Sequence, residues 1–367
     1  MLFVEGITVR NFRSLNSVTI GVDRHGYGKP LTNISCFIGK PNTGKSNFLD
    51  VFSFVQEVNS YGISYACSTR GGFDAIRTKG KHSPIEFEFA FSDIIGNKYK
   101  YLFSLDKDDR GNVTKKERLT TKIPYQNTPH IDYSTSVNQF FRNAFYPRFT
   151  DDGLVNPIEN YPTLTLADDG NNFVSVMKRK SDFHETEKFF AFHIKEVLGI
   201  DNYSIIVTPE KNCENDTVFK QQFIAIDDSH KEVPTEDNRK SMSKGSLRYI
   251  ANLVLCKSLT DFSTVCINNL ECGIYFRLTE WLTEALKSCA IEARKNVFMV
   301  THSPYVLSQL KDEDVYIFWI NENGHTEVTR ANTIPSVHQK MQHGDNLGFM
   351  FGAGLLAPNE QGIFPED

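Results

Sequence analysis

The sequence predicts a mixed α/β fold whose core is assembled from both ends of the chain, with a β-rich lobe inserted between them. Apolar strands alternate with amphipathic helices near both ends of the 367-residue chain. A glycine-rich loop joins an early apolar strand to the helix after it. The middle of the chain shows the two-residue alternation of antiparallel strands. We therefore expect a core of residues 1–60 and 240–335, an inserted lobe of residues 61–239 and an irregular tail of residues 336–367.

The composition is that of a folded globular protein. Hydrophobic residues make up 40% and charged residues 23%, which excludes global disorder. A net charge of −5 argues against nucleic-acid binding by overall basicity, so such binding would need a local patch. The seven cysteines include no CxxC pair, which indicates a reducing cytoplasm and neither a disulfide frame nor a zinc site. No apolar run approaches the ~20 residues of a membrane helix, so we expect no membrane partner.

The N-terminal part of the core is expected to begin with two strands, at residues 3–9 and 18–21. Residues 34–38 (ISCFI) form a short apolar run that fits a buried strand. A helix is expected over residues 45–58, because its apolar positions fall at i, i+3, i+4 and i+7. One face of this helix should therefore pack inward.

The middle of the chain is expected to be largely antiparallel. Apolar residues alternate in 85–91 (IEFEFAF), and the segments 99–105 and 113–122 flank a turn at Asp109-Arg110-Gly111. Further expected elements are listed here in chain order: an irregular or helical insertion at 124–175, a helix at 183–198, strands at 203–208 and 219–226, and a loop at 227–242.

The C-terminal part returns to alternating helices and strands. A helix begins near Ser246, a short strand follows at residues 264–267, and an amphipathic helix lies between Leu278 and Cys289. Another buried strand is expected at residues 297–300, followed by a helix start with Ser303 as its cap and Pro304 as its first residue. A last strand pair is expected around the turn at residues 322–324.

A phosphate-binding loop is the strongest motif. Residues 39–46 (GKPNTGKS) fit G-x-x-x-x-G-K-[ST], with an apolar strand before them and an amphipathic helix after them. Glycines let successive backbone N–H groups face an anion, and the helix adds its positive dipole end. Lys45 would reach the β- and γ-phosphates of ATP, and Ser46 would ligate Mg²⁺. The candidate nucleotide-binding residues of this loop are Gly39, Asn42, Thr43, Gly44, Lys45 and Ser46.

Three further segments gain meaning from their order. They are residues 11–14 (NFRS), residues 243–248 (SKGSLR) directly before a helix, and residues 301–303 (THS) at the end of a strand. Alone, they are most often a strand end, a helix cap and a structural histidine. Together with the phosphate loop, their order resembles that of the ABC-type ATPases of the SMC/RecF/OLD class.

This resemblance implies a specific site for ATP between two head domains. By this resemblance, Lys45 and Ser46 of one head would hold the phosphates and the metal. Ser243 and Gly245 of the other head would close on the γ-phosphate. Arg248 lies in the same segment as these two residues, and we count it with the nucleotide-binding residues. His302 would sense the γ-phosphate, and Arg13 would lie near the phosphates. The resemblance thus predicts a homodimer or higher homo-oligomer with ATP in its interfaces.

One segment departs from the pattern of the class. The strand before the dimer-facing loop usually ends in Asp-Glu-Pro-Glu-x-Gly, whereas this chain reads Asn268-Asn269-Leu270-Glu271-Cys272-Gly273. Asn268 offers the metal only a neutral carbonyl oxygen, and Asn269 has no basicity with which to activate water. We therefore expect ATP and Mg²⁺ to bind with weak or absent hydrolysis. Glu271, two residues further on, is the alternative general base of a normally cycling ATPase.

The resemblance also suggests a biological role. Heads of this type without a fused nuclease domain are similar to the ATPase subunits of Septu, retron and PARIS antiphage systems. A separately encoded HNH or Toprim nuclease is then the expected effector. A RecF-like repair ATPase that binds DNA is the alternative, with residues 79–81, 178–180 and 239–240 as candidate basic stretches.

Overall fold

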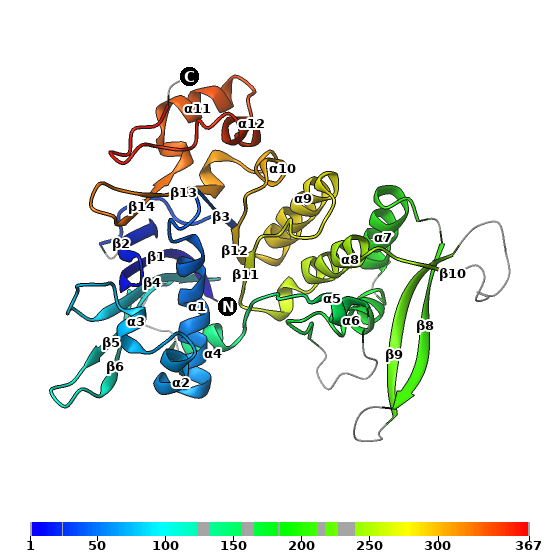
Figure 1. Ribbon diagram of the computed structural model, residues 1–367, viewed down its shortest axis with the longest axis horizontal. Coiled ribbons are helices and arrows are strands. Elements are labelled where there is room, and N and C mark those ends of the chain that lie inside the picture. The colour runs from blue at the N-terminus through cyan, green and yellow to red at the C-terminus, as the bar shows by residue number, and fades with distance from the viewer. Residues whose placement is uncertain are drawn as a thin grey trace. The chain divides into compact units, whose positions relative to one another are not determined.

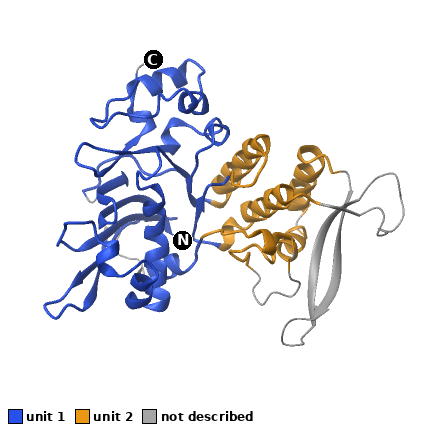
Figure 2. Cartoon of the chain, in the orientation of Figure 1, with its two compact units in different colours: residues 1–145, 262–270, 294–367 blue, residues 146–261, 271–293 orange. Residues whose placement is uncertain are grey.

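The structure is a computed structural model, and it describes residues 2–23, 25–122, 133–155, 157, 165–182, 184–200, 202–211, 217–226 and 239–365. The chain folds into two units, each built from several stretches of the sequence (Figure 2). The first unit comprises residues 1–145, 262–270 and 294–367, and the second comprises residues 146–261 and 271–293. Residues 61–145 therefore cluster with the phosphate loop, whereas the sequence suggested that they belong to the inserted lobe.

An antiparallel sheet in the first unit carries the alternating segments of the sequence (Figure 1). Its strand order is β2-β1-β4-β5-β6. Ile85, Phe87, Phe89 and Phe91 of β4 are all fully buried, as their alternation predicts. The strands are β1 (Leu2–Phe12), β2 (Leu15–Gly21), β4 (Ile85–Asp93), β5 (Lys98–Lys107) and β6 (Val113–Lys122).

A second sheet in the same unit is mainly parallel, with the order β14-β13-β3-β12-β11-β7. Strands β3 and β12 are buried along their whole length, which explains their unbroken apolar sequences. Only β14 runs antiparallel, in the hairpin that the turn at residues 322–324 predicted. The strands are β3 (Ile34–Ile38), β7 (Ala144–Phe145), β11 (Thr264–Asn268), β12 (Asn296–Val300), β13 (Val315–Ile320) and β14 (Thr326–Arg330).

Helix α1 (Lys45–Tyr61) packs against both sheets through its apolar face. The ring of Phe52 lies 5.6 Å from that of Phe89 on β4 and 4.7 Å from that of Phe298 on β12, measured between centroids. Helix α1, which begins at the end of the phosphate loop, is therefore anchored to both sheets. The other helices of this unit are α2 (Ile63–Ser68), α3 (Phe73–Ile76), α4 (Tyr133–Arg142), α10 (Pro304–Leu307), α11 (Pro335–Gln342) and α12 (Leu347–Gly352).

The second unit is built around α8, whose residues from Tyr249 to Cys256 are all buried. Its remaining described elements include a three-stranded antiparallel sheet in the order β10-β9-β8. The helices are α5 (Asp151–Val155), α6 (Phe173–Lys180), α7 (His184–Phe192), α8 (Lys244–Lys257) and α9 (Phe276–Ala293), and the strands are β8 (Asn202–Lys211), β9 (Thr217–Ile226) and β10 (Arg239–Ser241).

Some expected elements differ from those observed. The helix expected over residues 183–198 is α7 followed by a π-helical turn, His193–Val197. The tail is not simply irregular, because Pro335 starts α11 and the Asn346 side chain caps α12. Of the loop expected at residues 227–242, residues 239–241 form β10, and residues 227–238 lie outside the described residues.

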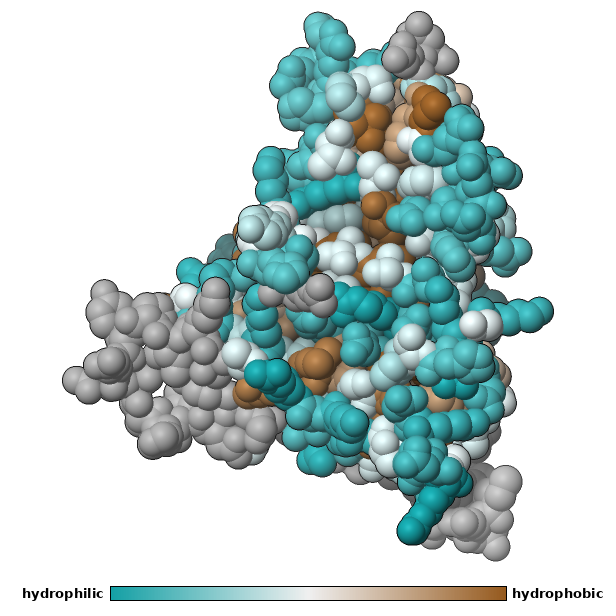
Figure 3. All heavy atoms as spheres, turned by 90° about the vertical axis from the view of Figure 1, so that its left-hand side faces the viewer, coloured by the Kyte–Doolittle hydropathy of each residue, from teal (hydrophilic) through white to brown (hydrophobic). Residues whose placement is uncertain are grey.

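Hydrophilic side chains dominate the face of the molecule that Figure 3 shows, with smaller apolar patches between them. Among the described residues, no helix combines the length and the apolar character that a membrane span requires.

A candidate nucleotide-binding site at the ends of the parallel strands

The phosphate loop leaves the buried strand β3 at Ile38 and enters α1 at Lys45. Two of its glycines have positive φ angles, +136° at Gly39 and +97° at Gly44. A Cβ on Gly39 would lie 2.0 Å from the carbonyl oxygen of Phe318, and one on Gly44 would lie 2.8 Å from Oγ1 of Thr326. Only glycine therefore fits at both positions, which accounts for the first two fixed positions of the motif.

Lys45 is held inside this loop by the loop's own carbonyl groups. Its Nζ donates to the carbonyl oxygens of Gly39, at 2.9 Å, and of Lys40, at 2.7 Å. The Thr43 hydroxyl donates to the same Lys40 oxygen at 2.9 Å. Burial lowers the pKa of Lys45 to about 8, so the ammonium is still mostly charged at neutral pH. A buried cation beside the N-terminus of a helix is a strong attractor for phosphate.

A hollow of about 320 Å³ opens over the loop. It brings together three segments that are far apart in the sequence, namely Ser14, residues 41–47 and His302. The register of the parallel strands explains the meeting, because Val300 on β12 lies beside Phe37 on β3 and both strands end at this edge. The loop and the predicted sensing histidine therefore share one hollow, and the side chains of Asn42 and Ser46 are exposed there.

The turn between β1 and β2 docks on the start of α1. Arg13, which has a φ of +52°, donates from Nη1 to Oδ1 of Asn47 at 3.1 Å and forms an ion pair with Asp50 at 3.2 Å. Asn47 in turn donates to the Ser14 hydroxyl at 3.0 Å. Arg13 therefore lies next to the phosphate loop, and its partners Asn47 and Asp50 were not predicted from the sequence. Their closeness to the two motifs is the only signal that pointed to them.

The end of β11 lies at the same edge of the parallel sheet. Asn268 is exposed and pairs in register with Val300. Asn269 has a φ of +60°, a conformation that Asn tolerates, and its N–H donates to the Val300 carbonyl at 2.9 Å. The Oδ1 atom of Asn269 is buried and accepts no hydrogen bond from the described residues. An orphaned polar atom at this edge of the parallel sheet fits a site that is completed by a bound ligand.

These residues fit a nucleotide better than they fit an isolated metal ion. None of the residues that line the hollow is an aspartate or a glutamate. No cluster of three metal-ligating side chains occurs anywhere in the described part of the chain. Mg²⁺ prefers carboxylate and phosphate oxygens, so Ser46 and Asn268 would hold it only together with a bound polyphosphate.

Residues 243–248, which are expected to close on ATP held by a second copy, belong to the second unit. Ser243 caps α8, and its Oγ accepts from the Ser246 N–H at 3.1 Å. A Cβ on Gly245 would lie 3.0 Å from the Gly273 carbonyl oxygen, so α8 begins close to the loop that follows Glu271. Ser243 is exposed, as a residue that meets a partner must be. Glu271 also belongs to this unit and is half-buried.

Arg248 is occupied within the second unit. Its Nη1 donates to the Phe149 carbonyl at 3.0 Å, and its Nη2 pairs with Asp151 at 3.1 Å. Lys244 pairs with the same carboxylate at 2.8 Å, and both cations lower the pKa of Asp151, Lys244 most strongly. These contacts hold the start of α8 against α5, and a role for Arg248 in nucleotide binding stays a prediction.

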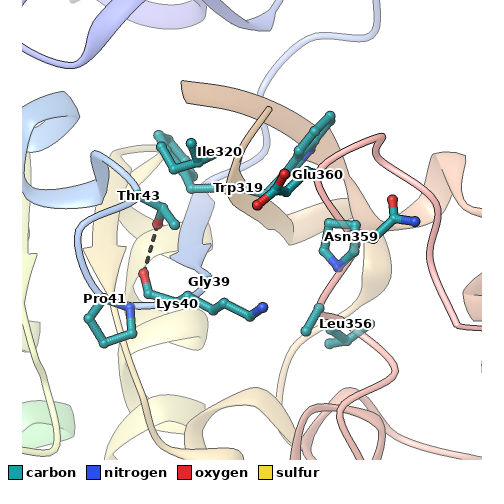
Figure 4. A pocket seen from close by; sticks show the side chains of 12 residues that line it. Gly39, Lys40, Pro41, Thr43, Trp319, Ile320, Leu356, Asn359 and Glu360 are labelled. Atoms are coloured by element: carbon teal, nitrogen blue, oxygen red, sulfur yellow. Dashed lines mark hydrogen bonds between the residues drawn. The ribbon is translucent and has the colours of Figure 1, made fainter. Parts of the chain in front are cut away.

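A second hollow of about 320 Å³ lies beside the phosphate loop, between the loop and the tail (Figure 4). The Lys40 side chain points into it, and Trp319 and Glu360 flank it. No sequence pattern indicated this hollow, because the tail reaches it only through tertiary packing. Gly362 permits that packing, since a Cβ there would lie 2.7 Å from the Trp319 ring.

Comparison with known structures agrees with this geometry. An SMC head bound to the C-terminal winged-helix domain of ScpA is 11% identical, has a TM-score of 0.53, and covers 89% of this chain and 97% of its own. An SMC head with an extended coiled coil from Pyrococcus furiosus, bound to the C-terminal domain of ScpA, is 10% identical, has a TM-score of 0.51, and covers 93% and 100%. The fold is therefore that of the P-loop ATPase heads of SMC proteins, which confirms the predicted fold class.

The sequence itself matches one family model. No curated protein matches the chain. Residues 34–308 match the family described as "AAA domain, putative AbiEii toxin, Type IV TA system". The matched stretch runs from the start of β3 to the end of α10 and so includes the phosphate loop, the start of α8, the end of β11 and His302. The chain belongs to this AbiEii-type family of AAA ATPase domains.

Proposed function

We propose that this protein is an ATP-binding regulatory subunit of an antiphage defence complex. In this proposal, two or more copies associate around ATP and control a separately encoded nuclease of the HNH or Toprim type. ATP serves mainly as a ligand, because its hydrolysis is weak or absent.

The observation that carries the proposal is which residues stand at the ends of the parallel strands, at one edge of their sheet. The phosphate loop and His302 supply what is needed to bind a triphosphate, namely a buried cation, glycine-framed N–H groups and a polar side chain in the same hollow. The end of β11 supplies only the neutral amides of Asn268 and Asn269. The site therefore has the groups that bind a triphosphate, but positions 268 and 269 lack the carboxylates that would hold the metal and activate water.

The chemistry of Asn269 is the reason to expect weak hydrolysis. A general base typically contributes ~10²–10⁴-fold to a rate, and an amide cannot accept a proton near neutral pH. If ATP is not consumed, its useful effect is the free energy with which it favours one assembly over another. Such a protein would regulate its partner by whether ATP is bound, and not by the hydrolysis of ATP.

Three observations support association and a partner. The start of α8 is exposed and capped by Ser243. Its backbone N–H groups can therefore face the phosphates of ATP that is bound to a second copy. The matching family is described in terms of a toxin–antitoxin system, which by its name has two components. Both SMC heads of similar fold were solved with a bound partner domain.

Equilibrium binding tests the proposal most simply. We expect isothermal titration of the full chain with ATP and Mg²⁺ to show saturable binding. Lys45→Ala should abolish this binding, whereas Lys40→Ala, which removes a neighbouring side chain that points into the other hollow, should retain it. Binding that is absent in the wild type, or equal in the wild type and Lys45→Ala, would contradict the proposal.

DNA binding is the alternative role, and one of its candidate basic residues already has a partner. Of the candidate basic stretches, Lys180 is already paired with Asp261 at 2.8 Å. The side chains of Arg239 and Lys240 lie outside the described ones. A repair ATPase would bind duplex DNA with an affinity that falls steeply with salt, and this measurement separates the two roles.

A further inference from the structure

Ser14 lines the hollow over the phosphate loop, although it belongs to the turn between β1 and β2. A Cβ on Gly44 of the loop would lie 2.9 Å from the hydroxyl oxygen of Ser14, so this hydroxyl stands directly beside the loop backbone. Arg13, its neighbour in the same turn, is not among the residues that line the hollow. The residue that this turn contributes to the hollow is therefore Ser14.

The neighbours of Ser14 determine the direction of its hydrogen bond. The Nδ2 atom of Asn47 lies 3.0 Å from the hydroxyl oxygen of Ser14, and the Oδ1 atom of Asn47 lies 3.1 Å from Nη1 of Arg13. A guanidinium can only donate, so the Asn47 atom that faces Arg13 must be the carbonyl oxygen. The amide nitrogen of Asn47 then faces Ser14, and it too can only donate. The Ser14 oxygen therefore accepts this hydrogen bond, and the proton of the hydroxyl points elsewhere.

The hydroxyl of Ser14 keeps a donor that the protein does not use. A serine hydroxyl can donate one hydrogen bond and accept two. Within the part of the chain that the structure describes, the contact with Asn47 is the one hydrogen bond of this side chain, and Ser14 is the acceptor in it. The proton is thus left for an acceptor in the hollow.

A partly buried ion network holds Asn47 in this orientation through Arg13. Arg13 pairs with Asp50 at 3.2 Å. Asp50 also accepts two hydrogen bonds from Arg70, at 2.7 Å on Oδ1 and 2.9 Å on Oδ2, and the Arg70 side chain is only 7% exposed. Nη1 of Arg13 is therefore fixed between Asp50 and Asn47. Each hydrogen bond from Arg70 to Ser14 has one possible direction, and bonds connected in this way polarise one another.

We propose that Ser14 is a further nucleotide-binding residue, whose hydroxyl donates to a phosphate oxygen, and that Asn47 is its positioning residue. The inference rests on the ATP binding proposed above, because it concerns the same hollow. Phosphate oxygens accept hydrogen bonds, and a bond to a charged oxygen is about twice as strong as one between neutral groups. Because Asn47 orients the hydroxyl before the ligand arrives, binding does not have to order it.

A purely structural role explains only part of the arrangement. The contact between Ser14 and Asn47 helps to dock the turn on α1. The turn is already anchored without it, because the Arg13 N–H donates to the Ile76 carbonyl at 2.7 Å and the Arg13 side chain pairs with Asp50. Docking also does not require a hydroxyl that lines the hollow.

Titration calorimetry of the full chain tests the inference with two ligands, each in the presence of Mg²⁺. They are ATP and inorganic tripolyphosphate, which has the phosphates without the base and the sugar. Ser14→Ala should weaken the binding of both about tenfold, whereas Ser14→Thr, which keeps a hydroxyl, should stay within about threefold of the wild type. Ser17→Ala is the matched control and should bind normally, because it removes an exposed hydroxyl on β2 that does not line the hollow.

Asn47→Ala tests the positioning role separately. It should weaken ATP binding in the wild-type background. In the Ser14→Ala background it should cause no further loss, because the hydroxyl that it orients is gone. Losses that simply add in the double variant would contradict the positioning role.

The inference is overturned if Ser14→Ala binds ATP as tightly as the wild type, if Ser17→Ala is equally damaging, or if tripolyphosphate shows no loss. If Lys45→Ala abolishes ATP binding and Ser14→Ala leaves it unchanged, the proposed function stands and only this inference is wrong. If the wild type binds no ATP, both are wrong.

Discussion

Lys45 is the side chain on which nucleotide binding depends most directly, and its burial gives that binding a pH dependence. Burial lowers its pKa to about 8, far below the usual value near 10.5. As the pH rises through 8, the unliganded site loses its positive charge, and the attraction for polyphosphate weakens.

We therefore predict that the ATP dissociation constant rises between pH 7.5 and 9.5, with a slope that approaches about tenfold per pH unit. Titration calorimetry at several pH values across this range measures the dissociation constant. Lys45→Arg is the control, because its guanidinium stays charged and its profile should be flat, even if binding is weaker overall. A flat profile in the wild type would show that Lys45 does not titrate in this range.

His193 makes the second unit sensitive to acid. It is buried, its Nδ1 lies 2.7 Å from the Tyr249 hydroxyl, and desolvation followed by repulsion from Lys257 lowers its pKa to about 4. Between pH 6.5 and 4, the unfolded chain binds a proton at this residue and the folded chain does not. The free energy of unfolding should therefore fall as the pH drops through this window.

The double variant His193→Phe/Tyr249→Phe removes the titrating group and its partner together, so neither polar group is left buried alone. We predict a shallower loss of stability between pH 6.5 and 4 for this variant, measured by urea unfolding at several pH values. The same slope in both proteins would rule out His193 as the source.

At the level of helices, a buried ion network ties α1 to α2. Arg70, only 7% exposed, pairs with Asp50 at 2.7 Å and with Glu57 at 2.6 Å, and its guanidinium lies 5.2 Å from the centre of the Phe54 ring. Asp50 also pairs with Arg13. The helix that begins at the phosphate loop is thus linked through one carboxylate to both arginines.

We predict that Arg70→Ala lowers the free energy of unfolding by about 3–5 kcal/mol, because it leaves two partly buried carboxylates unpaired. Lys107→Ala breaks a surface pair with Asp74 and should cost under about 1 kcal/mol. Urea unfolding of both variants checks the difference. Equal small losses would mean that the network is not a major source of stability.

The sequence predicted those helices and strands that depend on residues close together in the chain. The run ISCFI, the alternation in β4 and the Ser303-Pro304 start of α10 all formed as expected, because burial pattern and capping act within a few residues. The contact of Gly44 with Thr326 and the pair between Glu5 and Lys98 join distant parts of the chain. No periodicity or motif encodes such contacts, so the second hollow beside the phosphate loop emerged only from the fold.

For the whole molecule, the proposal requires ATP to bring copies together. We predict that sedimentation velocity shows a larger species with ATP and Mg²⁺ than without them. Ser243→Arg should prevent this change, because it places a bulky charged side chain at the exposed start of α8. Ser288→Arg, the same substitution at an exposed position of α9, is the control and should leave association intact.

ATP binding by the monomer should survive Ser243→Arg, since the phosphate loop lies in the other unit. If ATP leaves the sedimentation coefficient of the wild type unchanged, association around the nucleotide is wrong. If both arginine variants associate normally, the start of α8 is not part of the interface.

The rate of phosphate release at saturating ATP tests the central claim, which is that this site holds ATP without an effective general base. We predict a rate near background for the wild type and a rate ~10²-fold or more higher for Asn268→Asp/Asn269→Glu, which restores both carboxylates at the end of β11. A wild type that releases phosphate as fast as this variant, and loses that activity in Lys45→Ala, would contradict the claim.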